Sequence, residues 1–235
     1  MSTKKRILLK LTGEVFLDPK SGKLSTTAIK NVITQIKRLE NKYQFGIVTG
    51  GGNFFRGEQG KQLGITPWCA HQIGMLATMM NGIMINNLLK QQNIISEVFN
   101  AIVCQGFGMP ISYDVVQNSL KEGKTLIFVG GTGNPFFTTD TNAVLRALQI
   151  GADEIWKGTD VAGVYSNDPH VDPSATFIKD LTYQEALNMH LGVMDATAFT
   201  LASVHKLTIR IFNIFADNAL LQTIENKDFG SIIHP

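Results

Sequence analysis

The stretch Val129 to Leu148, V-G-G-T-G-N-P-F-F-T-T-D-T-N-A-V-L-R-A-L, decides the fold that this sequence predicts. It continues the short apolar run Lys124 to Val129, whose β-branched and aromatic residues are typical of a buried central strand. The glycines at 130, 131 and 133 then permit a tight turn, because they lack the Cβ that restricts other residues. The chain can therefore bend sharply beside a ligand at this point.

A helix is predicted to begin directly after this turn. Thr138, Thr139 and Asp140 are N-cap candidates, and Gly151 is expected to end the helix. The apolar face of this helix consists of Ala143, Val144, Ala147 and Leu148. Free N–H groups and the positive end of the helix dipole would point at the turn, which favours phosphate. An ordinary strand-to-helix connection without a ligand is the alternative interpretation.

Two more predicted strands run directly into glycine. The strand Lys5 to Leu11 is followed by Thr12 and Gly13, and the strand Gln44 to Thr49 is followed by three glycines at 50–52. Glycine runs weaken a chain unless a ligand or a neighbouring backbone comes close. Because the carboxyl ends of parallel strands meet at one edge, we expect all three turns to converge there.

Two cations accompany these turns. Lys10 is embedded in the first apolar strand, where its ammonium would project into a crevice at the strand end. Arg56 follows the glycines at 50–52 and would aim a guanidinium at phosphate oxygens. Asp140 is predicted to orient Lys10. A solvent-exposed lysine and a surface ion pair of the arginine are the alternatives.

The remaining periodicity alternates strands with helices. Helices are expected at 26–42, 68–90, 112–121, 181–189, 193–206 and 218–225, and further strands at 94–103, 154–157, 208–215 and, as a last edge strand, 231–234. A strand or hairpin is expected after Val161, with a turn at 167–169. This alternation predicts one α/β domain over residues 1–235, a three-layer αβα sandwich with a mostly parallel central sheet.

The composition and the cysteine positions narrow the possible partners and the location of the protein. A net charge of +2, without a basic run beyond Lys4 to Arg6, indicates neither nucleic acid nor a membrane surface as the main partner. The segment Met1 to Leu11 is too short and too polar for a signal peptide or a membrane span, so we expect a cytoplasmic protein. Cys69 and Cys104 are interpreted as reduced core thiols, with a disulfide or a metal site as the alternative.

The helix expected at 68–90 is apolar nearly all round. Its apolar residues recur at spacings of three and four: Met75, Leu76, Met79, Met80, Ile83, Met84 and Leu88. Such a helix is predicted to be buried, and part of it can be buried by another subunit. Self-association is therefore a hypothesis.

The motifs favour direct phosphoryl transfer. The P-loop pattern fails, since Asn118 replaces its first glycine and Gly123-Lys124-Thr125 precedes a strand. The sequence also contains no dinucleotide-binding glycine pattern, no protein-kinase set that combines H-R-D with D-F-G, since H-R-D is absent, and no nucleophile elbow. In-line transfer requires positive charge and placement more than it requires a base.

Six segments resemble the bacterial uridylate kinases within the broader amino-acid kinase fold family. These segments are K-R-I-L-L-K-L-T-G-E at Lys5, V-T-G-G-G-N-F-F-R-G at Val48, I-G-M-L-A-T at Ile73, G-T-G-N-P-F-F-T-T-D at Gly131, G-V-Y-S-N-D-P at Gly163 and M-D-A-T-A-F-T-L-A at Met194. The resemblance covers nearly the whole chain in register. It implies ATP-dependent phosphorylation of UMP to UDP by a homohexamer, with Mg²⁺ carried by the nucleotide phosphates and not by protein ligands, and with UTP as an inhibitor.

The resemblance also implies site residues. Lys10, Arg56 and Asp140 would be catalytic. ATP would contact Lys10, Leu11, Thr12, Gly13, Gly52, Arg56, Thr159, Tyr165 and Asp168. UMP would contact Gly51, His71, Thr132, Gly133, Asn134, Pro135, Phe136, Phe137, Thr138 and Thr139. Asp195 matches a further family position, where a helix N-terminal carboxylate is the favoured interpretation.

The chain departs from the family pattern at three places. His71 stands where the family has an aspartate that contacts the UMP ribose, and Ala162 stands where the family often has a second acid. The family's GTP-binding stretch is not recognisable in Asp18 to Leu24. Two other functions stay open: a carboxylate or carbamate kinase of the same fold, and a non-enzymatic nucleotide-binding protein.

Overall fold

The central sheet forms because apolar runs recur along the chain and each run ends in a glycine or polar turn. The computed structural model describes residues 4–189 and 191–235. Residues 1–3, part of the opening segment for which neither a signal peptide nor a membrane span is expected, lie outside the described residues. Among the described helices, none has both the length and the apolar character to cross a membrane.

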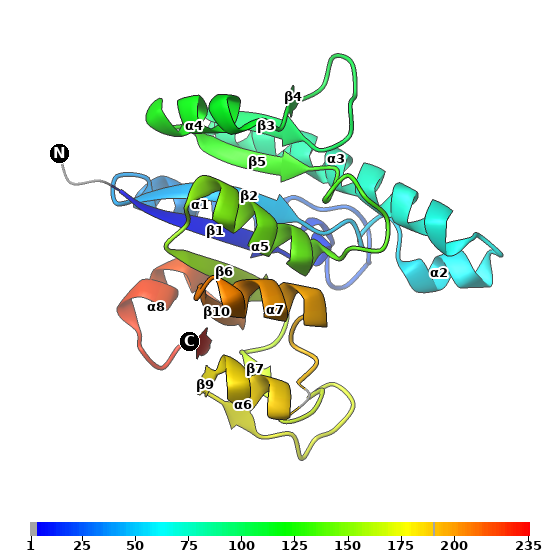
Figure 1. Cartoon of the computed structure of the whole chain (residues 1–235), viewed down its shortest axis with the longest axis vertical. Helices are drawn as coiled ribbons and strands as arrows, with labels where there is room; N and C mark the ends of the chain where they lie inside the picture. The colour runs from blue at the N-terminus through cyan, green and yellow to red at the C-terminus, as the bar shows by residue number, and fades with distance from the viewer. Residues whose placement is uncertain (1–3, 190) are drawn as a thin grey trace.

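Nine strands form one sheet, in the order β4-β3-β5-β2-β1-β6-β10-β11-β9 (Figure 1). Their bounds are β1 (Lys5–Leu11), β2 (Tyr43–Thr49), β3 (Ser96–Asn100), β4 (Met109–Pro110), β5 (Thr125–Val129), β6 (Glu154–Thr159), β9 (Asp180–Thr182), β10 (Thr208–Asn213) and β11 (Ser231–His234). Every neighbouring pair is parallel except β10 with β11. A separate antiparallel pair joins β7 (Val164–Tyr165) to β8 (Phe177–Ile178). The predicted mostly parallel sheet is confirmed.

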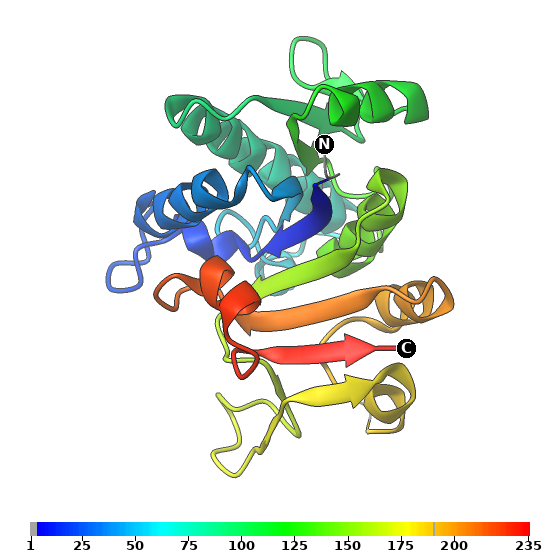
Figure 2. The same cartoon turned by 90° about the vertical axis from the view of Figure 1, so that its left-hand side faces the viewer.

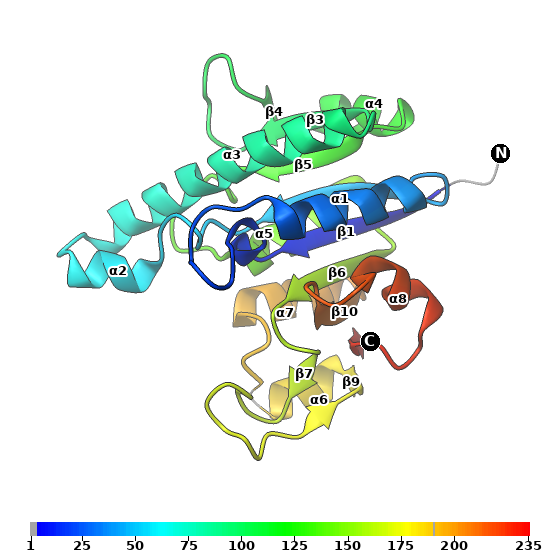
Figure 3. The same ribbon diagram turned by 180° about the vertical axis from the view of Figure 1, so that it is seen from behind.

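Helices cover both faces of this sheet, as Figures 1 and 3 show from opposite sides and Figure 2 shows from the side. One face carries the 3₁₀ helix η1 (Gly13–Phe16), α1 (Thr27–Leu39), α3 (Pro67–Gln91) and α8 (Ala219–Glu225). The other face carries α4 (Tyr113–Lys121), α5 (Thr139–Ile150), α6 (Tyr183–Asn188) and α7 (Ala196–Val204). The short α2 (Gly57–Gln62) lies beside the first turns of α3. The three-layer αβα architecture is confirmed.

Alternation along β1 shows why both faces are buried. Ile7, Leu9 and Leu11 pack into one hydrophobic cluster, whereas Leu8 packs into the other. Successive side chains of a strand point to opposite faces, so an apolar strand of this kind needs a helix layer on each side.

Two predicted strands differ from the structure. The strand expected at 94–103 is shorter, because β3 ends at Asn100 and the chain then turns through Gly106 and Gly108, whose φ angles are 82° and 74°. Ser231–His234 is not the edge strand, because β11 pairs with β10 on one side and with β9 on the other. The edge is β9, which forms where a helix was expected to begin.

The expectation of buried cysteines was wrong. Cys69 and Cys104 are both free and exposed. Cys104 lies on the loop after β3, and Cys69 lies in the first turn of α3. That helix has 25 residues, or roughly 37 Å at 1.5 Å per residue, so its start extends beyond the strands that it covers.

The helix α3 is also not buried all round. Leu76, Met80 and Ile83 are 51%, 44% and 50% exposed and form an apolar stripe, because residues four and three positions apart share a helix face. The opposite face, which includes Ala77, Ile85 and Leu89, is buried against the sheet.

Candidate active site

The three glycine turns meet at the carboxyl edge of the sheet, as predicted. A Cβ on Gly13 would lie 3.0 Å from the backbone nitrogen of Gly52. A Cβ on Gly50 would lie 3.5 Å from the nitrogen of Gly13 and 3.8 Å from Oγ1 of Thr139, at the start of α5. The ends of β1, β2 and the turn after β5 therefore form one surface.

The turn after β2 is held from α3. Asn81 donates a hydrogen bond of 2.7 Å to the carbonyl oxygen of Gly50, and it also exchanges hydrogen bonds with Asn53. Gly51 lies so close to α3 that a Cβ would be 2.8 Å from the carbonyl oxygen of Gly74. Only glycine fits there without movement of the backbone.

The N-termini of α5 and α7 are joined through one carboxylate. Thr138 caps α5, since its Oγ1 accepts hydrogen bonds from the N–H groups of Asp140 (3.1 Å) and Thr141 (3.2 Å). The hydroxyl of Thr138 in turn donates to Asp195, and Thr141 donates to the same carboxylate at 2.9 Å. Asp195 is itself the N-cap of α7, which confirms its interpretation as a helix N-terminal carboxylate.

A charge cluster lies beneath these turns. Nζ of Lys10 is 3.0 Å from Oδ1 of Asp140, and Nζ of Lys157 is 2.6 Å from Oδ2. The two lysines face each other across the β1–β6 register, and Lys157 also donates to the carbonyl oxygen of Val193. The three side chains are only 10–15% exposed, and together they carry one positive charge. The predicted pair of Lys10 with Asp140 is present in the structure.

Burial and the attraction of the two ammonium groups have opposite effects on the pKa of Asp140. Burial alone favours the neutral form of Asp140, but the two ammonium groups outweigh burial and hold the pKa of Asp140 below its ordinary value. Burial, and then repulsion from Lys10, lower the pKa of the Lys157 ammonium. The contact of Lys10 with Oδ1 lacks hydrogen-bond geometry, so this buried oxygen has no hydrogen-bond partner within residues 4–189 and 191–235.

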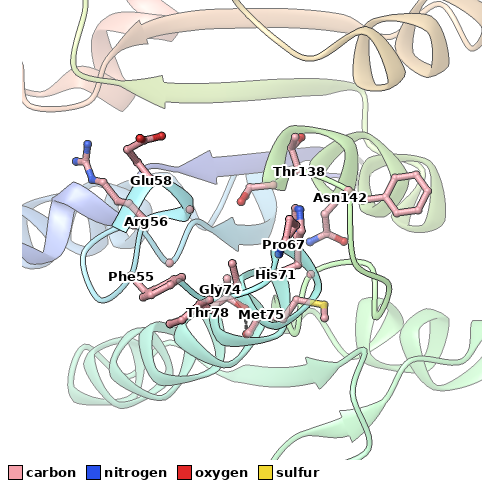
Figure 4. Close-up of a pocket in the computed structure, with 18 of the residues that line it drawn as sticks. Phe55, Arg56, Glu58, Pro67, His71, Gly74, Met75, Thr78, Thr138 and Asn142 are labelled. Carbon is pink, nitrogen blue, oxygen red and sulfur yellow. Dashed lines mark hydrogen bonds between the residues drawn. The ribbon is translucent and has the colours of Figure 1, made fainter. Parts of the chain in front are cut away.

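A first pocket of about 620 Å³ opens between α3 and the start of α5 (Figure 4). The residues predicted to contact UMP that line it are Gly51, His71, Phe137, Thr138 and Thr139. Gly52 and Arg56, which were predicted to contact ATP, line this same pocket. His71 lies against the ring of Phe136, with 5.0 Å between ring centroids. This pocket contains both glycine-turn backbone and a cation.

Arg56 does not stand free in that pocket. Its guanidinium forms an ion pair with Glu14 on η1, and its side chain is 57% exposed. The main chain of Arg56 is fixed by a hydrogen bond of 2.9 Å to the side chain of Gln59. The predicted aim of the arginine at phosphate oxygens therefore requires it to leave or share Glu14.

A second pocket, of about 700 Å³, lies on the other side of the charge cluster. Thr159, Tyr165 and Asp168, all predicted to contact ATP, line it together with Lys157. Since Lys157 faces this pocket and Thr139, the neighbour of Asp140, faces the first, Asp140 lies between the two pockets. The charge cluster is therefore adjacent in the chain or in space to the walls of both pockets.

Several predicted residues line neither pocket. They are Lys10, Leu11, Thr12, Gly13, Thr132, Gly133, Asn134, Pro135, Phe136 and Asp140. Lys157, on the other hand, was missed by the sequence interpretation. The signal was present, because Lys157 ends the strand predicted at 154–157 immediately before a glycine, and Lys10 lies close to the end of β1.

The described residues include no group of three or more His, Cys, Asp or Glu side chains that could hold a metal ion. Asp140, which contributes the one buried carboxylate oxygen without a hydrogen-bond partner in that part of the chain, is flanked by two ammonium groups. This positive neighbourhood does not suit a divalent cation held by the protein alone.

Comparison with known proteins agrees with this geometry. The model of the amino acid kinase family matches residues 5–213. The UMP kinase from Ureaplasma parvum is 34% identical, with a TM-score of 0.93 over 99% of this chain and 100% of that one. The UMP kinase from Bacillus anthracis is 29% identical, with a TM-score of 0.91 over 98% and 96% of the two chains. The uridylate kinase from Archaeoglobus fulgidus, 23% identical with a TM-score of 0.73 over 97% and 99%, shares the fold.

Proposed function

Because the chain belongs to the amino acid kinase family, we propose that it is a UMP kinase, which transfers the γ-phosphoryl group of ATP to UMP and so contributes to pyrimidine nucleotide synthesis. The two full-length likenesses to UMP kinases support this choice of substrate. The observation that carries the proposal is the position of the Lys10–Asp140–Lys157 cluster between two nucleotide-sized pockets.

The first pocket is assigned to UMP and the second to ATP. The glycine turns and the start of α5 would hold the acceptor phosphate, since N–H groups at a helix N-terminus favour anions. Lys157 would face the ATP phosphates from the second pocket, and Lys10 would approach from β1. Positive charge at this place stabilises the oxygens that gain negative charge during in-line transfer.

Asp140 acts as an orienting group in this proposal. Its two carboxylate oxygens each face one lysine ammonium, so it fixes the direction of both cations and offsets one of their charges. It is not a general base, because its pKa is held below the ordinary value and two cations occupy its oxygens. Magnesium bound by the phosphates of ATP stays a prediction, as do inhibition by UTP and location in the cytoplasm.

A competitive panel tests the substrate. The purified chain is incubated with ATP and Mg²⁺, with UMP, dUMP, CMP, AMP and GMP in one arm and with small carboxylates and carbamate in the other. We expect UMP to give the largest kcat/KM of all acceptors. Preferred phosphorylation of a carboxylate or of carbamate would replace UMP kinase with the other kinase chemistry of this fold.

A further inference from the structure

Asn142 is a buried polar side chain that the proposed mechanism does not use. It is 1% exposed, yet it lines the first pocket one helical turn after Thr138. Figure 4 shows it at the pocket wall formed by α5, facing the side of the pocket where His71 lies. A buried amide needs hydrogen-bond partners, so the direction of its donors matters.

Arg146 settles the orientation of the Asn142 amide. Nε of Arg146 lies 3.1 Å from the side-chain oxygen of Asn142. A guanidinium contains only donors, so the atom that faces it has to be the amide oxygen. The Nδ2 group is consequently turned away from Arg146, and it donates no hydrogen bond within the part of the chain that the structure describes.

Arg146 is itself held rigidly below the pocket wall. It is 3% exposed, donates to Oε1 of Gln149 at 2.7 Å and to the carbonyl oxygen of Gly131 at 3.1 Å, and lies 5.8 Å from the ring centre of Phe128. Within the described residues, none of its hydrogen-bond partners is a carboxylate. Burial lowers the pKa of Arg146 to about 10, which leaves it charged at neutral pH.

The guanidinium of Arg146 therefore fixes two parts of the wall of the first pocket, Gly131 and Asn142. Arg146 draws the carbonyl of Gly131 away from the pocket, and it turns the N–H donors of Asn142 toward the pocket. Its unneutralised charge also makes the potential behind this wall positive. An oxygen atom of a bound acceptor is the chemical group that such a wall would receive.

We propose that Asn142 is a further acceptor-binding residue, which donates an N–H to an oxygen of the bound nucleoside monophosphate, and that Arg146 is the positioning residue that keeps this donor turned toward the pocket. This inference rests on the proposed function, because it assigns the first pocket to the acceptor. Nothing in the resemblance to known kinases assigns a role to either side chain.

Calorimetric titration with UMP tests the role of Asn142. Asn142→Ala and the similarly shaped Asn142→Asp should each weaken UMP binding by about fivefold or more, while KM for ATP stays unchanged. Asn86→Ala is the matched control and should leave UMP affinity unchanged, since the side-chain oxygen of Asn86 also accepts a hydrogen bond, from Ser96, but Asn86 does not line the pocket. UMP affinity equal to that of the parent in a folded Asn142→Ala protein would overturn the inference.

A double-mutant cycle tests the role of Arg146. If Arg146 acts through Asn142, Arg146→Gln should weaken UMP binding in the parent but have little further effect in the Asn142→Ala background. Equal losses in both backgrounds would contradict a positioning role. Arg146→Lys, whose ammonium also donates, should recover much of the affinity and serves if the glutamine variant does not fold.

Turnover of UMP by the parent chain distinguishes a failure of this inference from a failure of the proposed function. If the parent phosphorylates another nucleoside monophosphate of the panel but not UMP, UMP kinase activity is excluded, and the same variants are then titrated with that acceptor. A loss of affinity for it would still support the role of Asn142. Normal UMP turnover by the parent with unchanged affinity in the variants would contradict the role of Asn142 alone.

Discussion

Lys157 is the side chain whose role is most open to a direct test at the scale of single residues. Substitution Lys157→Met removes one of two cations from Asp140 and leaves the carboxylate with Lys10. We expect kcat to fall by more than about tenfold, or roughly 1.4 kcal/mol of transition-state stabilisation, with a smaller change in KM for UMP. Steady-state kinetics with ATP and UMP measure both constants.

A matched control for Lys157 exists elsewhere in the chain. Lys124 also contacts two carboxylates, those of Glu97 at 3.0 Å and Glu122 at 2.7 Å, but it lies outside both pockets. Lys124→Met should therefore leave kcat unchanged. Equal kcat in the Lys157→Met protein and the parent would mean that the second ammonium serves only the packing of Asp140.

Arg56 provides the second test at this scale. Arg56→Ala should lower turnover by more than tenfold, about 1.4 kcal/mol or more, because a phosphate in the first pocket would lose its guanidinium. Stability should hardly change, since an ion pair this exposed contributes about 0–1 kcal/mol. Thermal unfolding and turnover are compared with Lys179→Ala, which breaks the exposed pair with Asp228. Unchanged turnover would make Arg56 peripheral.

Single residues show where sequence reasoning succeeds and where it stops. The pair of Lys10 and Asp140 could be predicted, because a lysine in an apolar strand needs a carboxylate and the glycine turns indicate where strands meet. Lys157 was missed, because its depth depends on the pairing of β6 with β1, which periodicity does not give. Cys69 and Cys104 were misjudged, since apolar neighbours do not reveal where a helix extends beyond a sheet.

The junction of α5 and α7 is the feature to test at the scale of elements. Asp195 accepts hydrogen bonds from Thr138 and Thr141 on α5 and from the N–H groups of Thr197 and Ala198 on α7. Asp195→Ala removes the cap of one helix and the link to the other, so we expect a loss of about 2 kcal/mol in the free energy of unfolding. Denaturant titration measures this loss.

The contribution of local hydrogen bonds to stability can be separated from the contribution of the link between α5 and α7. The carboxylate of Asp18 also accepts several hydrogen bonds, but within the described residues these come only from Lys20 and Ser21 in its own loop. Asp18→Ala should cost much less stability, and UMP affinity should decline only in the Asp195 variant, whose α5 N-terminus loosens at the first pocket. Equal losses in the free energy of unfolding of the two variants would show that the link between the helices adds nothing to stability.

Most elements could be predicted, because strong periodicity and caps mark them. The predicted turn before α5 and the predicted end of α5 at Gly151 agree with the structure. The predicted bounds of the longer helices α1, α3 and α4 also agree with it to within a few residues. The helix α2 was not predicted, since two glycines interrupt its six residues. The helix α6 begins later than expected because Thr182 and Glu185 form a capping box, and β9 occupies the preceding residues.

The exposed apolar stripe on α3 bears on assembly, at the scale of the whole molecule. The stripe of Leu76, Met80 and Ile83 on α3 is exposed in one chain, and burial of such a stripe by a second copy would be favourable. We expect sedimentation equilibrium to give a species larger than the monomer, with the hexamer as the predicted state. Met80→Glu should shift it to smaller species, whereas Val204→Glu, at a 70% exposed position on α7, should not. A monomeric parent at micromolar concentration would remove the hypothesis.

In the proposed reaction of the whole molecule, one phosphoryl group passes from ATP in one pocket to UMP in the other beside Lys10, Asp140 and Lys157. Phosphorus NMR of the purified chain with ATP, Mg²⁺ and UMP observes substrates and products together. We expect UDP and ADP to appear in equal amounts, and we expect Lys10→Met to abolish the formation of both. A folded parent that leaves UMP unchanged, or that forms ADP and inorganic phosphate without UDP, would contradict the proposed reaction.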